Sequence, residues 1–175
     1  MSVLAAGLNS GVYKFVLVLH IVCAIVGFGA VFLNGLYAAQ IRAYKGREGL
    51  AISEANYAVS NVAEYLIYAV PVLGIILVPL SDDAWKFSQG WISASLLLYV
   101  VGIAVSHAVL RPGHKRLNVL MRELVDAGPP TAGAGGAPPQ VAEMEQVGKR
   151  MAAAGLSLDV LLIVIVFLMV FKPGA

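Results

Sequence analysis

The sequence predicts an all-α membrane protein built as a bundle of four transmembrane helices. The chain has 175 residues, of which 59% are hydrophobic and 13% charged, whereas about a quarter of the residues in a soluble domain are charged. Its mean hydropathy is +0.83. Four apolar runs are each long enough to cross a bilayer core of about 30 Å, which takes roughly 20 residues of helix.

Composition also limits the kind of function. The formal net charge of +2 is too small to indicate a nucleic-acid-binding protein, and membrane topology explains the basic residues better. The single cysteine, Cys23, lies within the first apolar run, so one chain can form neither a disulfide framework nor a multi-cysteine metal site. We expect one membrane domain over residues 1–175, and composition predicts no cofactor.

The first apolar run, residues 13–41, carries a stripe of small and polar side chains on one helical face. Its other faces carry Phe, Val, Leu and Ile, which are compatible with lipid. This pattern is typical of a transmembrane helix whose small residues pack against neighbouring helices. The stripe consists of His20, Ala24, Gly27, Val31, Asn34 and Ala38.

The second and third apolar runs, residues 52–80 and 91–110, are joined by a short polar connection. Pro71 lies within the second run and is expected to kink that helix, because proline has no backbone N–H to donate. Trp85 and Trp91 bracket the connection as an aromatic belt does at a membrane surface.

The third helix is expected to break or bend at residues 111–116, a basic stretch that contains Pro112 and Gly113. The amphipathic residues that follow either lie on the membrane surface or extend the helix. Residues 128–139 form a Gly- and Pro-rich linker that is expected to be mobile. The fourth span covers residues 150–171.

Lysine and arginine residues predict the orientation of the bundle. They are concentrated in the first and third connections, whereas the second contains only Lys86. By the positive-inside rule, the first and third connections are cytoplasmic and both termini are extracytoplasmic, in a bacterial inner membrane. Basic residues and one histidine in these two connections are expected to contact anionic lipid headgroups. They are Arg42, Lys45, Arg47, Arg111, His114, Lys115 and Arg116.

Five polar side chains are expected in the cytoplasmic half of the helices, with depth counted at a rise of about 1.5 Å per residue. They are Asn34, Asn61, Glu64, His107 and Asp159. A carboxylate near the middle of a bilayer costs roughly 2.5 to 3.5 kcal/mol. His107, the asparagines, Arg111 reaching inward, or simple protonation would offset this cost for the two carboxyl groups. The cluster either joins the helices through hydrogen bonds or serves a proton, ion or substrate.

His20 is a candidate ligand for haem b or a metal ion, and otherwise a hydrogen-bonded packing residue. A haem held by two histidines needs them on facing helices at nearly equal depth. His20 and His107 differ in depth by about nine residues, or about 13 Å, so they are not expected to share one iron. Tyr99 is the nearest residue of a ligand type at the depth of His20.

The segments 15–21, 27–29, 32–34 and 110–116 resemble motifs of the bacterial integral membrane family called domain of unknown function 2269. The resemblance covers most of the chain outside the linker. An apolar helix with a histidine followed by small residues is also distantly similar to the first span of copper-resistance D-type proteins and of the membrane protoporphyrinogen oxidase that binds haem b. That similarity implies His20 as a ligand, but the aromatic and charged residues that follow this histidine in the haem protein are absent here.

These features predict a small polytopic protein of the inner membrane that is not an enzyme. It is expected to be an accessory or assembly subunit of a membrane complex, or a small transporter-like protein. The alternative is a haem- or metal-linked redox protein that uses His20. Its expected partners are the lipid bilayer and other membrane subunits or further copies of the chain, because small-residue stripes allow helices to associate.

Overall fold

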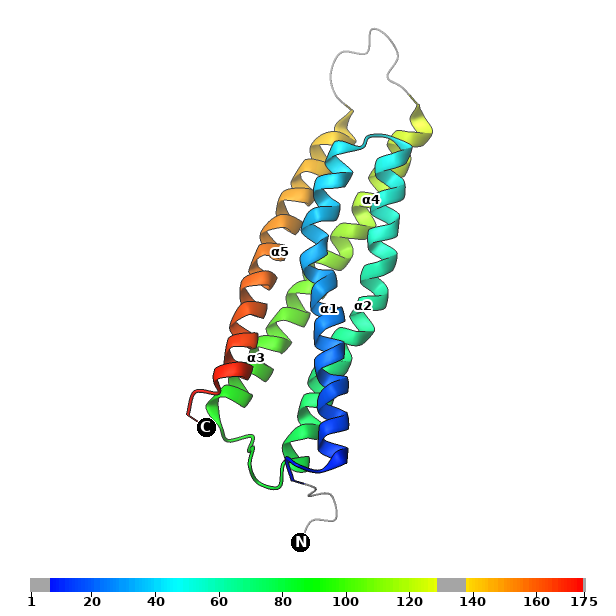
Figure 1. The fold of residues 1–175 in the computed structure, drawn as a ribbon. Coiled ribbons are helices and arrows are strands. Elements are labelled where there is room, and N and C mark those ends of the chain that lie inside the picture. The colour runs from blue at the N-terminus through cyan, green and yellow to red at the C-terminus, as the bar shows by residue number, and fades with distance from the viewer. Residues whose placement is uncertain (1–6, 129–137, 175) are drawn as a thin grey trace. The chain divides into compact units, whose positions relative to one another are not determined.

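A computed structural model describes residues 7–128 and 138–174 of the chain. All regular structure in these residues is helical (Figure 1), which confirms the all-α fold class. The linker expected at 128–139 lies mostly outside the described residues. The helices are α1 (Gly11–Ala43), α2 (Arg47–Leu80), α3 (Gly90–Val105), the short π-helix η1 (Ser106–Leu110), α4 (Arg111–Ala127) and α5 (Pro139–Phe171).

Four helical stretches are long and apolar enough to cross a membrane, as the sequence predicts. They are α1 with 33 residues, α2 with 34, the continuous stretch Gly90–Ala127 with 38, and α5 with 33. At about 1.5 Å per residue each is about 50 Å long or longer, while the hydrocarbon core of a bilayer is about 30 Å thick. Roughly 20 Å of each stretch therefore lies outside the hydrocarbon, unless the helix is strongly tilted.

The chain divides into two compact units, which we describe one at a time. Unit 1 comprises Met1–Ala30, Asn61–Gly102 and Val160–Ala175, and unit 2 comprises Val31–Ser60 and Ile103–Asp159. Each unit contains sections of α1, α2, α3 and α5.

The core of unit 1 gathers near the connection between α2 and α3. Tyr13 of α1 packs with Leu77 and Leu80 of α2, and Trp91 of α3 packs with Val78 of α2 and Leu168 of α5. Both clusters include the half-buried ring of Trp85. The apolar ends of all four helices in this unit are therefore joined through the two tryptophans.

A close approach of α1 to α2 in unit 1 depends on Gly27. This glycine is buried, and a Cβ atom added to it would lie 3.0 Å from Ile67 Cγ1 and 3.3 Å from the backbone nitrogen of Ile67. The small-residue stripe predicted on the first helix thus includes at least one position where only glycine leaves room for the neighbouring backbone.

In unit 2, α4 is an amphipathic helix whose buried residues are Asn118, Leu120 and Met121. Gly113 of α4 faces Met151 of α5, because an added Cβ atom would lie 2.7 Å from both Cγ and Sδ of that methionine. The helix ends at Gly128, which adopts a left-handed φ of 73°, as glycine commonly does after the last turn of a helix.

Where the sequence predicts a break or bend, at residues 111–116, the helix continues, and a widened turn precedes this stretch. The backbone N–H of Arg111 donates to the carbonyl of Ser106, five residues earlier, and the helix continues into α4. Pro112 lies directly after this widened turn, in the first turn of α4, and lacks the N–H that a regular α-helix would use there. Of the two possibilities left open by the sequence, the structure shows α4 extending the third helix.

Gly27→Val should lower the midpoint of thermal unfolding by several degrees, because the added atoms press on the backbone of α2. Overpacking of this kind costs about 1–3 kcal/mol. Circular dichroism of the full chain in detergent measures the effect. Gly29→Val is the matched control, since no atom lies within 4 Å of a Cβ added there. Equal losses from both variants would contradict the close approach of α1 and α2.

Candidate functional site

A proline in α2 leaves one carbonyl group of unit 1 without its helical donor. Pro71 has no N–H, so the carbonyl of Ile67, four residues earlier, receives no bond from it. The hydroxyl of Tyr99 in α3 donates to this carbonyl over 2.7 Å. The ring of Tyr99 is buried and packs at 6.1 Å between centroids from Phe28 of α1. Tyr99 therefore supplies from a neighbouring helix the hydrogen bond that Pro71 removes.

His20 contacts the same segment of α2. Its Nδ1 lies 2.9 Å from the carbonyl oxygen of Val70, and because a carbonyl only accepts, Nδ1 carries the proton in this bond. The half-buried ring lies next to Gly74, where an added Cβ atom would come within 3.3 Å of His20 Cε1. In a neutral ring of this tautomer, Nε2 is the nitrogen left with a lone pair.

Unit 1 also contains two members of the expected polar cluster, Asn61 and Glu64, both half-buried on α2. The carboxylate of Glu64 accepts a hydrogen bond from the hydroxyl of Tyr68, one turn further along the same helix, at 2.5 Å. Glu64 is thus partnered within its own helix by a residue that the sequence analysis did not single out as its partner.

The other three members, Asn34, His107 and Asp159, lie in unit 2. Asn34 accepts a hydrogen bond of 3.3 Å from the hydroxyl of Ser60 on α2, while His107 is exposed in the π-helix η1. Asp159 of α5 is half-buried, and its Oδ1 is a buried oxygen with no hydrogen-bond partner among the described residues. As a single cluster that links all four helices, the five residues remain a prediction.

Polar contacts join α2 to α4 in unit 2. The hydroxyl of Ser53 donates to Asn118 Oδ1 at 2.5 Å, and both residues are more than nine-tenths buried. One turn away, His114 lies edge-on to the ring of Tyr57, with 6.2 Å between centroids and an interplanar angle of 87°. His114 is therefore packed against a neighbouring helix, and its expected contact with lipid headgroups stays a prediction.

Ion pairs extend this contact to a third helix. Arg122 of α4 pairs with Glu54 of α2 at 2.7 Å. Arg116 of α4 makes two bonds to the carboxylate of Glu143 on α5, of 2.6 and 2.8 Å. The structure thus pairs Arg116 with a carboxylate of its own chain, and the expected contact of Arg116 with lipid headgroups stays a prediction. The remaining basic residues of that set are exposed, namely Arg42, Lys45, Arg47, Arg111 and Lys115.

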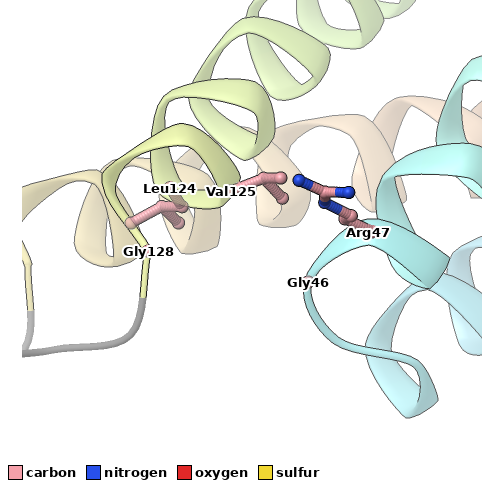
Figure 2. A pocket seen from close by; sticks show the side chains of 5 residues that line it. All are labelled: Gly46, Arg47, Leu124, Val125 and Gly128. Atoms are coloured by element: carbon pink, nitrogen blue, oxygen red, sulfur yellow. The ribbon is translucent and has the colours of Figure 1, made fainter.

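A shallow open pocket lies where the connection between α1 and α2 meets the end of α4. It is lined by Gly46, Arg47, Leu124, Val125 and Gly128. Figure 2 shows the guanidinium group of Arg47 directed toward the side chain of Val125. The lining offers one exposed cation and two aliphatic side chains, which is too little chemistry to define a ligand.

The bond from Tyr99 to Ile67 was the main feature missed from the sequence, although a signal for it was present. Pro71 inside an apolar run implies an unsatisfied carbonyl at position 67, and an unsatisfied carbonyl in lipid implies a donor from another helix. Tyr99 had been placed at the depth of His20 only as a ligand-type residue. The periodicity of α3 alone did not indicate which carbonyl it would reach.

Together, the four apolar helical stretches and the hydrogen bonds between their interior polar groups define a polytopic α-helical integral membrane protein. The chain belongs to the family described as predicted integral membrane protein (DUF2269), whose model matches residues 14–173. This match confirms the family resemblance and the association with a lipid bilayer. It does not extend to the copper-resistance and haem proteins, so that similarity remains a prediction. No curated protein and no solved structure matches the chain.

Tyr99→Phe should destabilise the protein by about 1 kcal/mol, because it leaves the carbonyl of Ile67 without a donor. Thermal unfolding in detergent measures the loss. Tyr65→Phe is the control, since Tyr65 is 76% exposed on α2 and should change little.

A double-mutant cycle tests the reason for this loss. Pro71→Ala returns a backbone N–H that can reach the carbonyl of Ile67, so Tyr99→Phe should cost less in the Pro71→Ala background than in the wild-type chain. An equal cost in both backgrounds would show that the role of Tyr99 is unrelated to the proline.

Proposed function

We propose that the protein is a non-enzymatic accessory or assembly subunit of a membrane complex. In this proposal, the apolar helices anchor a polar helical surface next to the bilayer, and that surface holds the partner. The observation that carries the proposal is an ordered, ion-paired extension of the helices in unit 2. We call this extension the helical head and define it as residues 47–60, 111–127 and 139–150.

The helical head is too polar to lie within the hydrocarbon. More than half of the chain's Asp, Glu, Lys and Arg residues are found in it, whereas the remainder of α5, residues 151–171, contains a single carboxylate, Asp159. That apolar remainder is about 31 Å long, which is enough to cross the bilayer without the head. By the positive-inside rule, we place the head on the cytoplasmic side of an inner membrane.

The contacts of the head favour a fixed surface over a flexible connection. α4 lies between two acidic partners, with Arg122 bound to Glu54 of α2 and Arg116 bound to Glu143 of α5. Exposed ion pairs of this kind contribute about 0–1 kcal/mol each, so their main effect is on orientation. The buried bond from Ser53 to Asn118 has a larger effect on register, because breaking it leaves a buried polar group unsatisfied.

The interior polar groups favour bracing of the helices over transport. His20, Tyr99 and Asn34 each have a hydrogen-bond partner on another helix of their own unit, as expected if they hold the helices together. Asp159 is the observation that favours a small transporter-like role, because its buried Oδ1 lacks a partner in the described residues and such carboxyl groups often carry protons or ions.

A redox role for His20 is the second candidate function. The bond from Nδ1 to the carbonyl of Val70 is the kind of contact that orients an imidazole for ligation through Nε2. We propose His20 as an axial ligand for haem b or a metal ion. An absorbance spectrum of the purified protein separates the two candidates. A Soret band that is lost in His20→Ala supports the redox role, and a colourless, metal-free protein supports the accessory role.

Reversing exposed charges of the head should release the partner without unfolding the protein. Lys115 and Arg150 are exposed, and neither has a carboxylate at ion-pair distance in the described part of the chain. The tagged full chain is cross-linked in native membranes, and the proteins recovered at fixed stoichiometry are identified. We expect Lys115→Glu combined with Arg150→Glu to reduce recovery by about tenfold, because the variant reverses the charge of the surface that is proposed to hold the partner.

Lys86→Glu is the matched control, because Lys86 is an exposed lysine of the connection between α2 and α3 in unit 1. It should leave recovery unchanged. Recovery of only further copies of the chain would identify the protein as a homo-oligomer. A wild-type chain that is recovered alone, or an equal loss in the control, would overturn the proposal.

A further inference from the structure

The two tryptophans of the chain form a rigid aromatic pair in unit 1. The rings of Trp85 and Trp91 meet edge to face, with 5.5 Å between centroids and an interplanar angle of 88°. Trp85 is held in place by two bonds, from its Nε1 to the hydroxyl of Tyr13 at 3.1 Å and from its backbone N–H to Ser81 Oγ at 2.9 Å. The pair is therefore preorganised by α1 and by the end of α2.

An ammonium group of the chain occupies this pair. The Nζ atom of Lys172 lies 4.1 Å from the ring centroid of Trp85 and 5.8 Å from that of Trp91. Both distances fall within the range of about 6 Å at which an indole face attracts a cation. No carboxylate of the described residues lies at ion-pair distance from Lys172. Attraction to the two rings is therefore the electrostatic contact that the structure shows for this ammonium.

The backbone of Lys172 is strained in the bound arrangement. Its φ of 46° is in the left-handed region, and its N–H donates to the carbonyl of Leu168 at 3.0 Å. This is the αL motif that closes a helix, in which the residue after the last turn is usually glycine. A lysine in this position therefore has a conformational cost that glycine avoids.

Trp91 of the same pair has a hydrogen-bond donor that is unsatisfied in the described part of the chain. Trp91 is 6% exposed, and its Nε1–H is buried without an acceptor among the described residues. The connection that carries Trp85 also contains two exposed acidic residues, Asp82 and Asp83, which favour a cation nearby. The region thus offers aromatic faces and negative charge to a positively charged group, and one unused donor.

We propose that the Trp85–Trp91 pair is a binding site for a small alkylammonium group, and that Lys172 is its built-in competitor. Tryptophan is enriched at the level of lipid headgroups, where an ethanolamine phospholipid carries such an ammonium. A soluble amine carries the same chemistry. The proposal is independent of the accessory function, because the site lies in unit 1 and uses none of the residues of the helical head.

Tryptophan fluorescence tests the site directly, because the chain has only these two tryptophans. The full chain is reconstituted in phosphatidylglycerol nanodiscs and titrated with tetramethylammonium and with ethanolamine. We expect Lys172→Met to respond at an apparent dissociation constant at least about fivefold lower than wild type, because the tethered competitor has been removed. Lys86→Met is the matched control and should respond like wild type, because Lys86 is an exposed lysine of the connection between α2 and α3.

The source of the ammonium is distinguished by repeating the titration in phosphatidylethanolamine nanodiscs. If the headgroup is the ligand, the emission of Lys172→Met differs between the two lipids and the soluble amines lose their effect in phosphatidylethanolamine. If a soluble amine is the ligand, the titrations agree in both lipids. Trp85→Phe keeps an aromatic ring and leaves Trp91 as the reporter, and it should weaken the response. No response of Lys172→Met to either amine or lipid, with helicity retained by circular dichroism, would overturn the proposal.

Discussion

The carbonyl group of Ile67 is the constraint on which the packing of unit 1 depends. In hydrocarbon a backbone carbonyl without a donor has a free-energy cost, since no water replaces the missing bond. Pro71 removes the helical donor, and Tyr99 supplies another from α3. The neighbouring carbonyl of Val70 receives a second donor from His20 of α1. One proline in α2 is therefore accompanied by side chains on two further helices, and each must lie at a defined depth and angle to reach its carbonyl.

Unit 2 is held by a different kind of contact. Its α2 and α4 sections meet through one buried polar pair, Ser53 and Asn118, and through ion pairs at the surface, among them Arg122 with Glu54. Water screens the surface pairs and would solvate the same groups in the unfolded chain, so they contribute little energy. The two units therefore differ in their polar contacts. In unit 1, side chains of α1 and α3 donate to backbone carbonyls of α2, whereas unit 2 carries ion pairs on an exposed polar surface.

Fold class was predictable because length and polarity set it directly. Runs of apolar residues longer than a bilayer is thick allow little besides helices, and the helices lie where those runs are. The sequence was less informative about which residues on neighbouring helices contact each polar side chain. Depth along a helix can be counted from the sequence, but the angle around the helix depends on how its neighbours pack. For this reason the sequence alone did not pair Arg116 with Glu143, 27 residues away, and did not place His114 beside the ring of Tyr57.

The widened turn at Ser106–Leu110 determines the direction in which the side chains of α4 point around the helix axis. A turn closed by a bond to the fifth preceding residue holds one residue more than an α-helical turn, and each residue rotates a helix by about 100°. Removal of one residue from η1 would leave the composition of α4 almost unchanged, yet it would swing Asn118 and Leu120 away from the positions in which they are now buried. The extra residue thus fixes the rotation of α4 about its axis, so that its apolar face is buried although no side chain of α4 differs.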